Sequence, residues 1–315
     1  MSHDKHIIDN VNKDVEVLRL DGITNRHEAK EYYLNLARNW EDPNPAPVVE
    51  EYDGVRVVRD DLLTGSKVRG GDCLISGLNH GTLVYVQPRT GLAGVSLLDV
   101  ARRHRKRVRL FMPSSKRISH HQACCIERGA DVSFHRVAAM PNLNAIAKKW
   151  ASEQEDAYFI PLGLKHELVT AGFVKVASKI PAPEEVWTVV STGVLHRALQ
   201  IAWPDTTFHA VAVARNMKDG EVGHDRIISA PEPFQKAIKE SEMPPFPSVA
   251  TYDAKCWRYI PKNSGRDILF WNVGTEPVLK DESIYETVDS YRKWAKDEES
   301  TSHGSGTNLE QNPFA

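Results

Sequence analysis

The sequence predicts an α/β fold in which open, mostly parallel sheets carry helices on both faces. From residue 72 onward, short apolar runs alternate with segments of ten or more residues that have helical spacing. Strands that alternate with helices of this length form parallel sheets. The chain has 315 residues, of which 41% are hydrophobic and 26% are charged. This composition is typical of a globular protein, and the length allows one large domain or two lobes.

The predicted elements follow one another in a regular order. Residues 26–40 have helical spacing, and the proline-rich segment 41–47 separates them from two short extended runs. Strands are then expected at 72–77, 81–88, 107–113, 130–137, 157–163, 184–193, 207–215 and 267–274. Helices are expected at 91–104, 115–129, 142–154, 166–180 and 194–203, with a further short helix at 230–241.

The two ends of the chain differ from this core. Residues 1–46 are expected to form an N-terminal helical extension to the α/β region, which spans 47–280. A C-terminal helix is expected at 281–296, because its aromatic residues share one face. The tail, 297–315, is polar and rich in glycine and serine, so we expect it to be disordered.

Bulk properties exclude several classes of protein. The formal net charge is −2, so the whole-molecule charge gives no reason to expect nucleic-acid binding, although a local basic patch can exist. No apolar run is long enough to span a bilayer, and the first residues lack the core of a signal peptide. Four cysteines in a chain of this length do not make a disulfide framework. We therefore expect a cytoplasmic protein without a membrane partner.

Chemistry is expected where strands lead into helices, because ligands bind beyond the carboxyl ends of the strands in open parallel sheets. One such turn, Ser191, Thr192, Gly193 and Val194, combines small residues, hydroxyls and free N–H groups at the start of a helix. A phosphate needs these groups, since the helix end carries partial positive charge. The same residues also suit an ordinary helix N-cap, and the sequence contains neither a Walker motif nor a dinucleotide fingerprint.

A lysine and a second loop accompany this turn. Lys67 follows a predicted strand, two aspartates and a Gly-Ser pair in "VRVVRDDLLTGSKVRG". A lysine, a phosphate loop and a carboxylate loop are the parts of a pyridoxal 5'-phosphate site, in which the cofactor is bound to the lysine as a Schiff base. The candidate carboxylate loop, which offers backbone amides, contains Gln87, Arg89, Thr90 and Gly91.

These segments resemble the fold-type II pyridoxal phosphate enzymes, which include cysteine synthase, threonine synthase and aminocyclopropane-carboxylate (ACC) deaminase. The segment around Lys67 is similar to their strand, acidic pair, glycine and Schiff-base lysine. "PRTGLAGVSLL", "AYFIPLGLKHELVTAGF" and "VSTGVLHRAL" stand in the family's order, and the resemblance covers about residues 48–275. It implies a catalytic Lys67 and two lobes around a cofactor cleft, with a smaller lobe inserted at approximately 80–165.

The chain also departs from the family pattern. Its phosphate loop has one glycine where the family has several, so the hydroxyls must contribute more. The family contacts the pyridine nitrogen from a Ser/Thr-Gly-Gly run, whereas this chain has "WNVGTEP", which leaves Asn272 and Thr275 as candidates. The carboxylate loop lacks the usual Ser-Gly-Asn or Gln-Ser-Asn, which indicates a different substrate.

A narrower resemblance concerns the substrate. "STGVLHRALQIAWPDTTFHAVAV", "PPFPSVATYDAKCW" and "ILFWNVG" are similar to the pyridoxal phosphate enzymes with which tailed bacteriophages hypermodify thymidine in DNA. The resemblance implies a decarboxylase for a glycyl- or seryl-type group on thymidine, which leaves an aminoalkyl base and protects the viral genome from host restriction. Modified phage DNA is then the substrate, in the host cytoplasm. Fold-type II enzymes are commonly dimers, so a homodimer is also implied.

A basic run bears on the DNA hypothesis. It either ends a helix, where cations suit the dipole, or contacts the phosphate backbone of DNA. Two other functions remain open: a deaminase or desulfhydrase-type lyase for a small free amino acid, and a non-catalytic DNA-binding or scaffold protein. The basic run contains Arg102, Arg103, Arg105, Lys106 and Arg107.

Three further groups are interpreted as structural. The acidic pair Asp60 and Asp61 is expected to orient its surroundings without a catalytic role. The histidines and cysteines of segment 119–125 are expected to lie on a surface and in a core, and no metal site is expected. The segment 252–257, "YDAKCW", is interpreted as a lid or a solvated loop.

Overall fold

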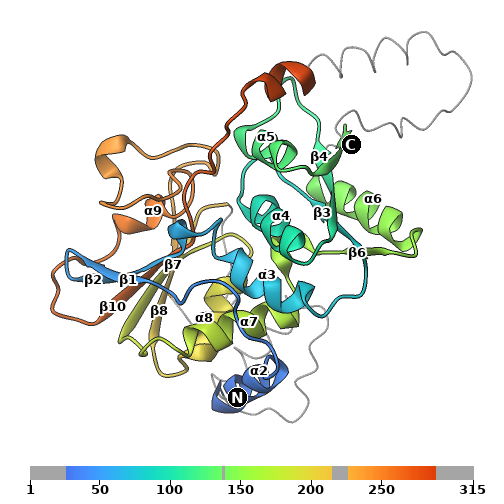
Figure 1. The fold of residues 1–315 in the computed structure, drawn as a ribbon. Helices are drawn as coiled ribbons and strands as arrows, with labels where there is room; N and C mark the ends of the chain where they lie inside the picture. Colours follow the sequence, from blue (N-terminus) through green and yellow to red (C-terminus); the bar gives the residue numbers. More distant parts are fainter. Residues whose placement is uncertain (1–25, 137–138, 215–225, 289–315) are drawn as a thin grey trace, which may run out of the picture. The chain divides into compact units, whose positions relative to one another are not determined.

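The computed structural model describes residues 26–136, 139–214 and 226–288, and these form two compact units. The first unit comprises the described residues of Met1–Leu78 and Leu162–Glu276. The second comprises those of Asn79–Pro161 and Pro277–Ala315. Each unit is built on a sheet with helices on both faces, as Figure 1 shows. The predicted α/β class with mostly parallel sheets is therefore confirmed.

The first unit contains a six-stranded sheet in the order β1-β2-β10-β7-β8-β9. All neighbours are parallel except β1 and β2, which are antiparallel. The carboxyl ends of β2, β10 and β7 therefore lie next to one another at one edge of the sheet. The strands are β1 (Val49–Tyr52), β2 (Val55–Arg59), β7 (Glu185–Val190), β8 (Thr207–Ala212), β9 (Arg226–Ser229) and β10 (Ile268–Asn272).

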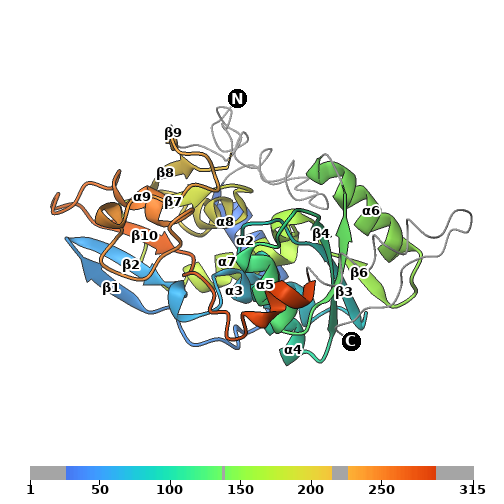
Figure 2. The same ribbon diagram turned by 90° about the horizontal axis from the view of Figure 1, so that it is seen from above.

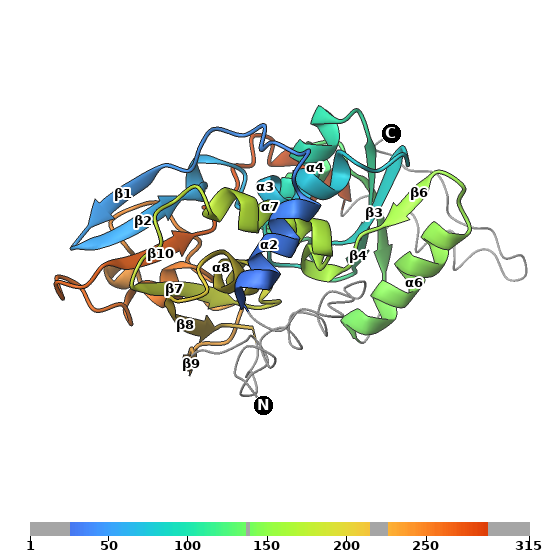
Figure 3. The same ribbon diagram turned by 90° about the horizontal axis from the view of Figure 1, so that it is seen from below.

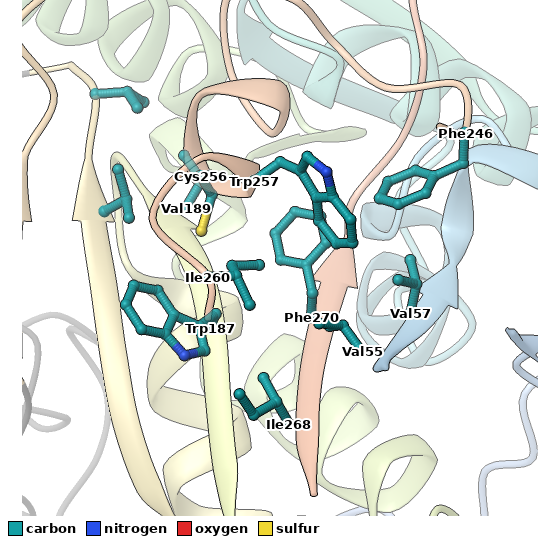
Figure 4. Close-up of a cluster of buried hydrophobic side chains, with 12 residues drawn as sticks. Val55, Val57, Trp187, Val189, Phe246, Cys256, Trp257, Ile260, Ile268 and Phe270 are labelled. Carbon is teal, nitrogen blue, oxygen red and sulfur yellow. The ribbon is translucent and has the colours of Figure 1, made fainter. Parts of the chain in front are cut away.

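The two faces of this sheet are covered differently. On one face, Phe270 packs against Trp257 of the short helix α9 (Ala254–Trp257), and Trp187 belongs to the same apolar cluster, which Figure 4 shows. On the other face, α8 (Val194–Ala202) places His196 edge-on against Phe208. Helices α7 (Glu167–Ala177), α3 (Lys67–Ile75) and α2 (Arg26–Leu36) continue this layer, as Figure 3 shows.

Helix α3 corrects the prediction of a strand at 72–77. The run "CLI" is short and apolar, and such a run does not distinguish a strand from a buried helix. Gly70 and Gly172 make the helix possible, because a Cβ on Gly172 would lie 3.0 Å from the Cα of Gly70. The glycines let α3 and α7 approach closely. Helix α3 begins at Lys67, directly after the turn that follows β2.

The second unit contains a four-stranded parallel sheet in the order β5-β4-β3-β6. Its strands are β3 (Thr82–Val86), β4 (Arg107–Pro113), β5 (Asp131–His135) and β6 (Ala157–Phe159). Helix α6 (Met140–Ser152) packs on Val84, Val86 and Phe111. Helices α4 (Ala93–Arg103) and α5 (His120–Glu127) lie together on the other face, as Figure 2 shows.

The remaining predicted elements have mixed outcomes. The helix expected at 230–241 is wrong: apart from the start of a 3₁₀ turn (Glu240–Glu242), these residues are irregular, because Pro231 and Pro233 interrupt the backbone. Residues 283–288 are helical, and the rest of the helix expected at 281–296 lies outside the described residues. The same holds for residues 1–25 of the N-terminal extension and for the tail 297–315.

Candidate active site

Lys67 is the first residue of α3 and lies at the carboxyl edge of the six-stranded sheet. The backbone N–H of Ser66 donates to the carbonyl of Val273, 2.7 Å away, directly after β10. The side chain of Lys67 is half-buried, and its Nζ donates to the carbonyl oxygen of Gly163 at 2.8 Å. The amine is thus fixed between the turn after β10 and the turn that precedes α7.

Gly163 connects this amine to the predicted phosphate loop. Its φ of +76° is one that favours glycine. A Cβ at this position would lie 2.5 Å from Cγ2 and 2.6 Å from Oγ1 of Thr192, so the Gly163 backbone lies directly against the Thr192 side chain. The structure therefore brings Lys67, Gly163 and the loop between β7 and α8 together.

The loop has the geometry of an anion-binding turn. Gly193 has a φ of 74° and precedes α8, so the backbone amides of the first helical turn follow it directly. Ser191 and Thr192 are half-buried, whereas Gly193 and Val194 are buried. An anion at this helix end would meet backbone N–H groups and the positive end of the helix dipole.

The environment lowers the pKa of Lys67 to about 8. Burial is the larger cause, because it disfavours the charged ammonium, and the positive charge of Lys165 adds to it. A lysine with this pKa is partly neutral near pH 8, which is the form that attacks a carbonyl carbon. Lys165 lies two residues after Gly163, and no local motif in the sequence marks either residue.

Asp60 and Asp61 hold the structure beneath this site, as expected. Asp60 accepts bonds from Arg69 Nε at 2.9 Å and from Trp271 Nε1 at 2.8 Å. Asp61 is bound by Arg59 through two 2.8 Å bonds. Both aspartates are buried in the turn after β2. The bonds of Asp60 to Trp271 and Arg69 connect this turn to β10 and to α3.

Asn272 and Thr275 were the candidates for the pyridine nitrogen. Asn272 Nδ2 donates to Asp61 Oδ1 and to the carbonyl of Pro247, both at 2.8 Å, and its Oδ1 lies 3.0 Å from Ser248 Oγ. Both amide hydrogens are thus used within the protein, and the contact of Asn272 with the pyridine nitrogen stays a prediction. Thr275 is half-buried, and its cofactor contact stays a prediction.

A buried carboxyl group at this edge has no such partner. Asp253 is 0% exposed, and neither of its oxygens makes a hydrogen bond to any residue that the structure describes. Burial raises its pKa well above the ordinary value, although the backbone amides of Val273 and Gly274 lie near enough to oppose the shift. The interpretation of "YDAKCW" as a solvated loop is therefore wrong, since Lys255 is also 0% exposed.

The predicted carboxylate loop lies in the second unit. Gln87 is buried, and its amide is bonded to the carbonyls of Pro88 and Gly91 and to the N–H of Gly94, at 2.9 to 3.1 Å. Arg89 is exposed and donates to the carbonyl of Arg117 at 3.0 Å. These bonds shape the loop, and its role toward a substrate stays a prediction, as does that of Thr90.

The basic run ends α4 in the same unit. Arg102 bonds Asp99 Oδ1 and the carbonyl of Arg128, both at 3.3 Å, and Lys106 Nζ donates to the carbonyl of His80 at 2.7 Å. Arg102, Arg103, Arg105 and Arg107 are exposed, whereas Lys106 is half-buried. Contact with DNA stays a prediction for all five residues. Among the described residues, no helix has the length and apolar character needed to cross a membrane.

Comparison with solved structures identifies the fold. The chain superimposes on a homologue of ACC deaminase with a TM-score of 0.64 at 15% identity, covering 77% of this chain and 94% of that one. It superimposes on the processed form of threonine deaminase isoform 2 from Solanum lycopersicum with a TM-score of 0.60 at 14% identity, covering 83% and 92%. The chain has the fold-type II fold.

A further fold-type II neighbour is a pyridoxal 5'-phosphate-dependent aspartate racemase, with a TM-score of 0.50 at 10% identity, covering 81% of this chain and 96% of that one. No protein-family model and no curated protein matches the sequence. At these identities the likeness establishes the fold alone.

Proposed function

We propose that the protein is a pyridoxal 5'-phosphate-dependent enzyme of the lyase or deaminase type, with Lys67 as the residue that bonds the cofactor. One observation carries the proposal: Lys67 Nζ is bonded to the carbonyl of Gly163, which lies against Thr192 of the anion-binding turn. An amine and a phosphate cradle are thereby adjacent at the carboxyl edge of one sheet, where ligands bind in parallel sheets.

The residues present fit this cofactor. Lys67, with a pKa of about 8, supplies the amine for its aldehyde. The amides that follow Gly193 suit its phosphate. Asp253, a buried carboxyl without a described hydrogen-bond partner, suits its ring nitrogen, because a carboxylate there keeps that nitrogen protonated. The fold-type II neighbours support the same choice.

The division of labour follows from these groups. When bound, the cofactor supplies an electron-withdrawing ring that weakens the bonds to the amine-bearing carbon of a substrate. Lys67 Nζ takes a proton from that carbon or returns one to it, as its pKa near neutrality allows. The carbonyl of Gly163 orients this amine. The loop at Ser191 to Gly193 would hold the phosphate of the cofactor.

Two substrates are proposed. A small free amino acid, deaminated or cleaved, is supported by the likeness to an ACC deaminase homologue and a threonine deaminase. Decarboxylation of a glycyl- or seryl-modified thymidine in phage DNA rests on the sequence resemblance and on the exposed arginines at the end of α4, which suit a phosphate backbone.

A spectroscopic experiment tests the cofactor assignment. The purified protein is incubated with pyridoxal 5'-phosphate and desalted, and its visible absorbance is recorded before and after borohydride reduction. We expect a band above 400 nm that borohydride abolishes, and a reduced pyridoxyl group on the peptide of Lys67. Lys67→Arg should lack both, whereas Lys149→Arg, at an exposed position, should keep both. A label on other lysines with none on Lys67 contradicts the proposal, and a protein that binds no cofactor supports the scaffold alternative.

A product assay then separates the substrates. The loaded protein is incubated with free amino acids, and ammonia is measured. In parallel it is incubated with DNA that carries glycyl- or seryl-modified thymidine. The DNA is then digested, and the masses of the nucleosides are measured by mass spectrometry. Loss of CO2 from the nucleoside supports the decarboxylase, and unchanged nucleosides together with ammonia release reject it.

A further inference from the structure

The turn between β7 and α8 is fixed by side chains on both sides. His196, in the first turn of α8, lies with Nδ1 2.6 Å from Thr188 Oγ1 of β7 and Nε2 3.2 Å from Gln200 Nε2. All three side chains are buried. The helix is therefore tied to the strand before the turn, which restricts the intervening residues although they include only one glycine.

Arg197 fixes the turn itself. Its side chain is one of the largest among the fully buried described residues, at 2% exposure. It lies one turn into α8, and its Nη2 returns to donate to the carbonyl of Thr192 at 2.5 Å. This bond holds the Thr192 carbonyl oxygen against the Arg197 guanidinium and so restricts the orientation of the Thr192–Gly193 peptide.

The charge of Arg197 is in an unusual place. A cation at the amino end of a helix opposes the helix dipole, and a buried cation loses its hydration. An anion bound by the turn gains from the charge of Arg197, in addition to any other bonds that the guanidinium makes, because opposite charges attract more strongly away from water.

We propose that Arg197 is a positioning residue for the phosphate: it orients the Thr192–Gly193 turn through the Thr192 carbonyl and supplies the positive charge beneath it. This inference rests on the proposed function. It explains how a turn with a single glycine holds a dianion that related turns hold with several glycines. The turn is thereby specific for a phosphorylated ring aldehyde over the same aldehyde without its phosphate.

The test compares pyridoxal 5'-phosphate with pyridoxal, which has no phosphate. Dissociation constants for both are measured by absorbance titration for the wild type, Arg197→Met, Arg197→Lys and the control Ile201→Val, a buried position of α8 one turn further on. We expect Arg197→Met to reduce the preference for the phosphorylated form at least about tenfold, as for the loss of a charged hydrogen bond. Arg197→Lys should restore part of it. Ile201→Val should affect both ligands equally.

The outcomes separate this inference from the proposed function. A wild type that binds neither aldehyde at Lys67 overturns the proposed function, and the inference with it. A wild type that prefers the phosphorylated form, with the preference kept in Arg197→Met, overturns the inference alone. An equal loss for both ligands also overturns it, since that result describes a structural arginine.

A measurement on the wild type covers the case in which Arg197→Met does not fold. The ³¹P resonance of the bound phosphate is followed from about pH 5.5 to about pH 8. A free phosphate monoester titrates near pH 6. We expect a constant shift, because buried positive charge keeps the phosphate dianionic. A titration near pH 6 would show that no such charge acts on it and would overturn the inference.

Discussion

Gly163 and Thr192 lie so close that a single added methyl group on Gly163 would overlap the threonine side chain. The added Cβ would be 2.5 Å from Thr192 Cγ2, at a position where φ is already +76°. Because the Gly163 carbonyl also holds the Lys67 amine, this contact sets the spacing between the reactive amine and the phosphate turn.

Gly163→Ala should therefore be strongly destabilising. We expect a loss of roughly 2 to 5 kcal/mol in the free energy of unfolding, from a positive φ together with overpacking. Gly265→Ala is the matched control, since Gly265 has a φ of 75° and no atom within 4 Å of the added Cβ. It should cost about 1 to 2 kcal/mol. Urea unfolding measures both, and equal losses would show that Thr192 does not constrain Gly163.

The reactivity of Lys67 should follow its lowered pKa. The neutral amine becomes abundant as pH rises through about 8, so borohydride-trapped labelling of Lys67 by pyridoxal 5'-phosphate should be half-maximal near pH 8. Lys165→Met removes the like charge and should move the midpoint upward, still below an ordinary lysine because burial remains. Lys149→Met, at an exposed position, should leave it unchanged. A midpoint near pH 10 in the wild type would contradict the assignment.

Asp253 should destabilise the cofactor-free protein. Because its folded pKa is raised, this group favours the folded state at low pH, and the benefit is lost as pH rises through the folded pKa. Asp253→Asn should raise the stability of the cofactor-free protein at pH 7 by roughly 1 to 3 kcal/mol, the cost of an unsatisfied buried polar group. It should also weaken cofactor binding.

Thermal unfolding at several pH values measures the effect of Asp253→Asn. Asp267→Asn is its control, because it removes the carboxylate from an ion pair with Arg56 of 2.9 Å and should lower stability slightly. A cofactor-free Asp253→Asn protein that is less stable than the wild type at pH 7 would show that Asp253 has an internal partner.

Asp60 should be essential to stability without taking part in the chemistry. Asp60→Asn removes one of the two carboxylates that pair with the buried Arg69, which keeps Asp42 at 2.6 Å, so we expect a loss of about 1 to 3 kcal/mol in the free energy of unfolding. Glu153→Gln breaks an exposed pair with Lys149 and should cost less than about 0.5 kcal/mol. Denaturant midpoints compare the two, and similar losses would contradict a structural role for Asp60.

Much of the fold could be predicted because the periodicity is strong. The predicted alternation from 81 to 213 corresponds to β3 through β8, since short extended runs alternate there with longer segments of helical spacing. The strand predicted at 72–77 was wrong, because three apolar residues fit a strand and a buried helix equally well. The close packing of this helix depends on Gly172 of α7, which is distant in the sequence. The short helix predicted at 230–241 was wrong, because its two prolines oppose a helix more strongly than its apolar spacing favours one.

The site was less predictable, because its defining contacts are long-range. Lys67 and Thr192 were chosen from local motifs, whereas Gly163, which joins them, has no local signal except its place after an expected strand. Asp253 was passed over because polar residues in a proline-rich segment are usually solvated. Only burial beside the Val273–Gly274 turn distinguishes it.

The pairing of β2 with β10 has a consequence for the order in which the molecule can be assembled. Trp271 pairs with Val58 across more than 200 residues, whereas 79–161 form a sheet from neighbouring segments alone. On a ribosome, that local sheet can form long before β10 emerges, because contacts of short separation close faster. Lys67 reaches its final setting only after Val273 has been synthesised to bond Ser66. The buried setting that lowers the pKa of this amine is therefore completed late in synthesis, after almost nine-tenths of the chain has been made.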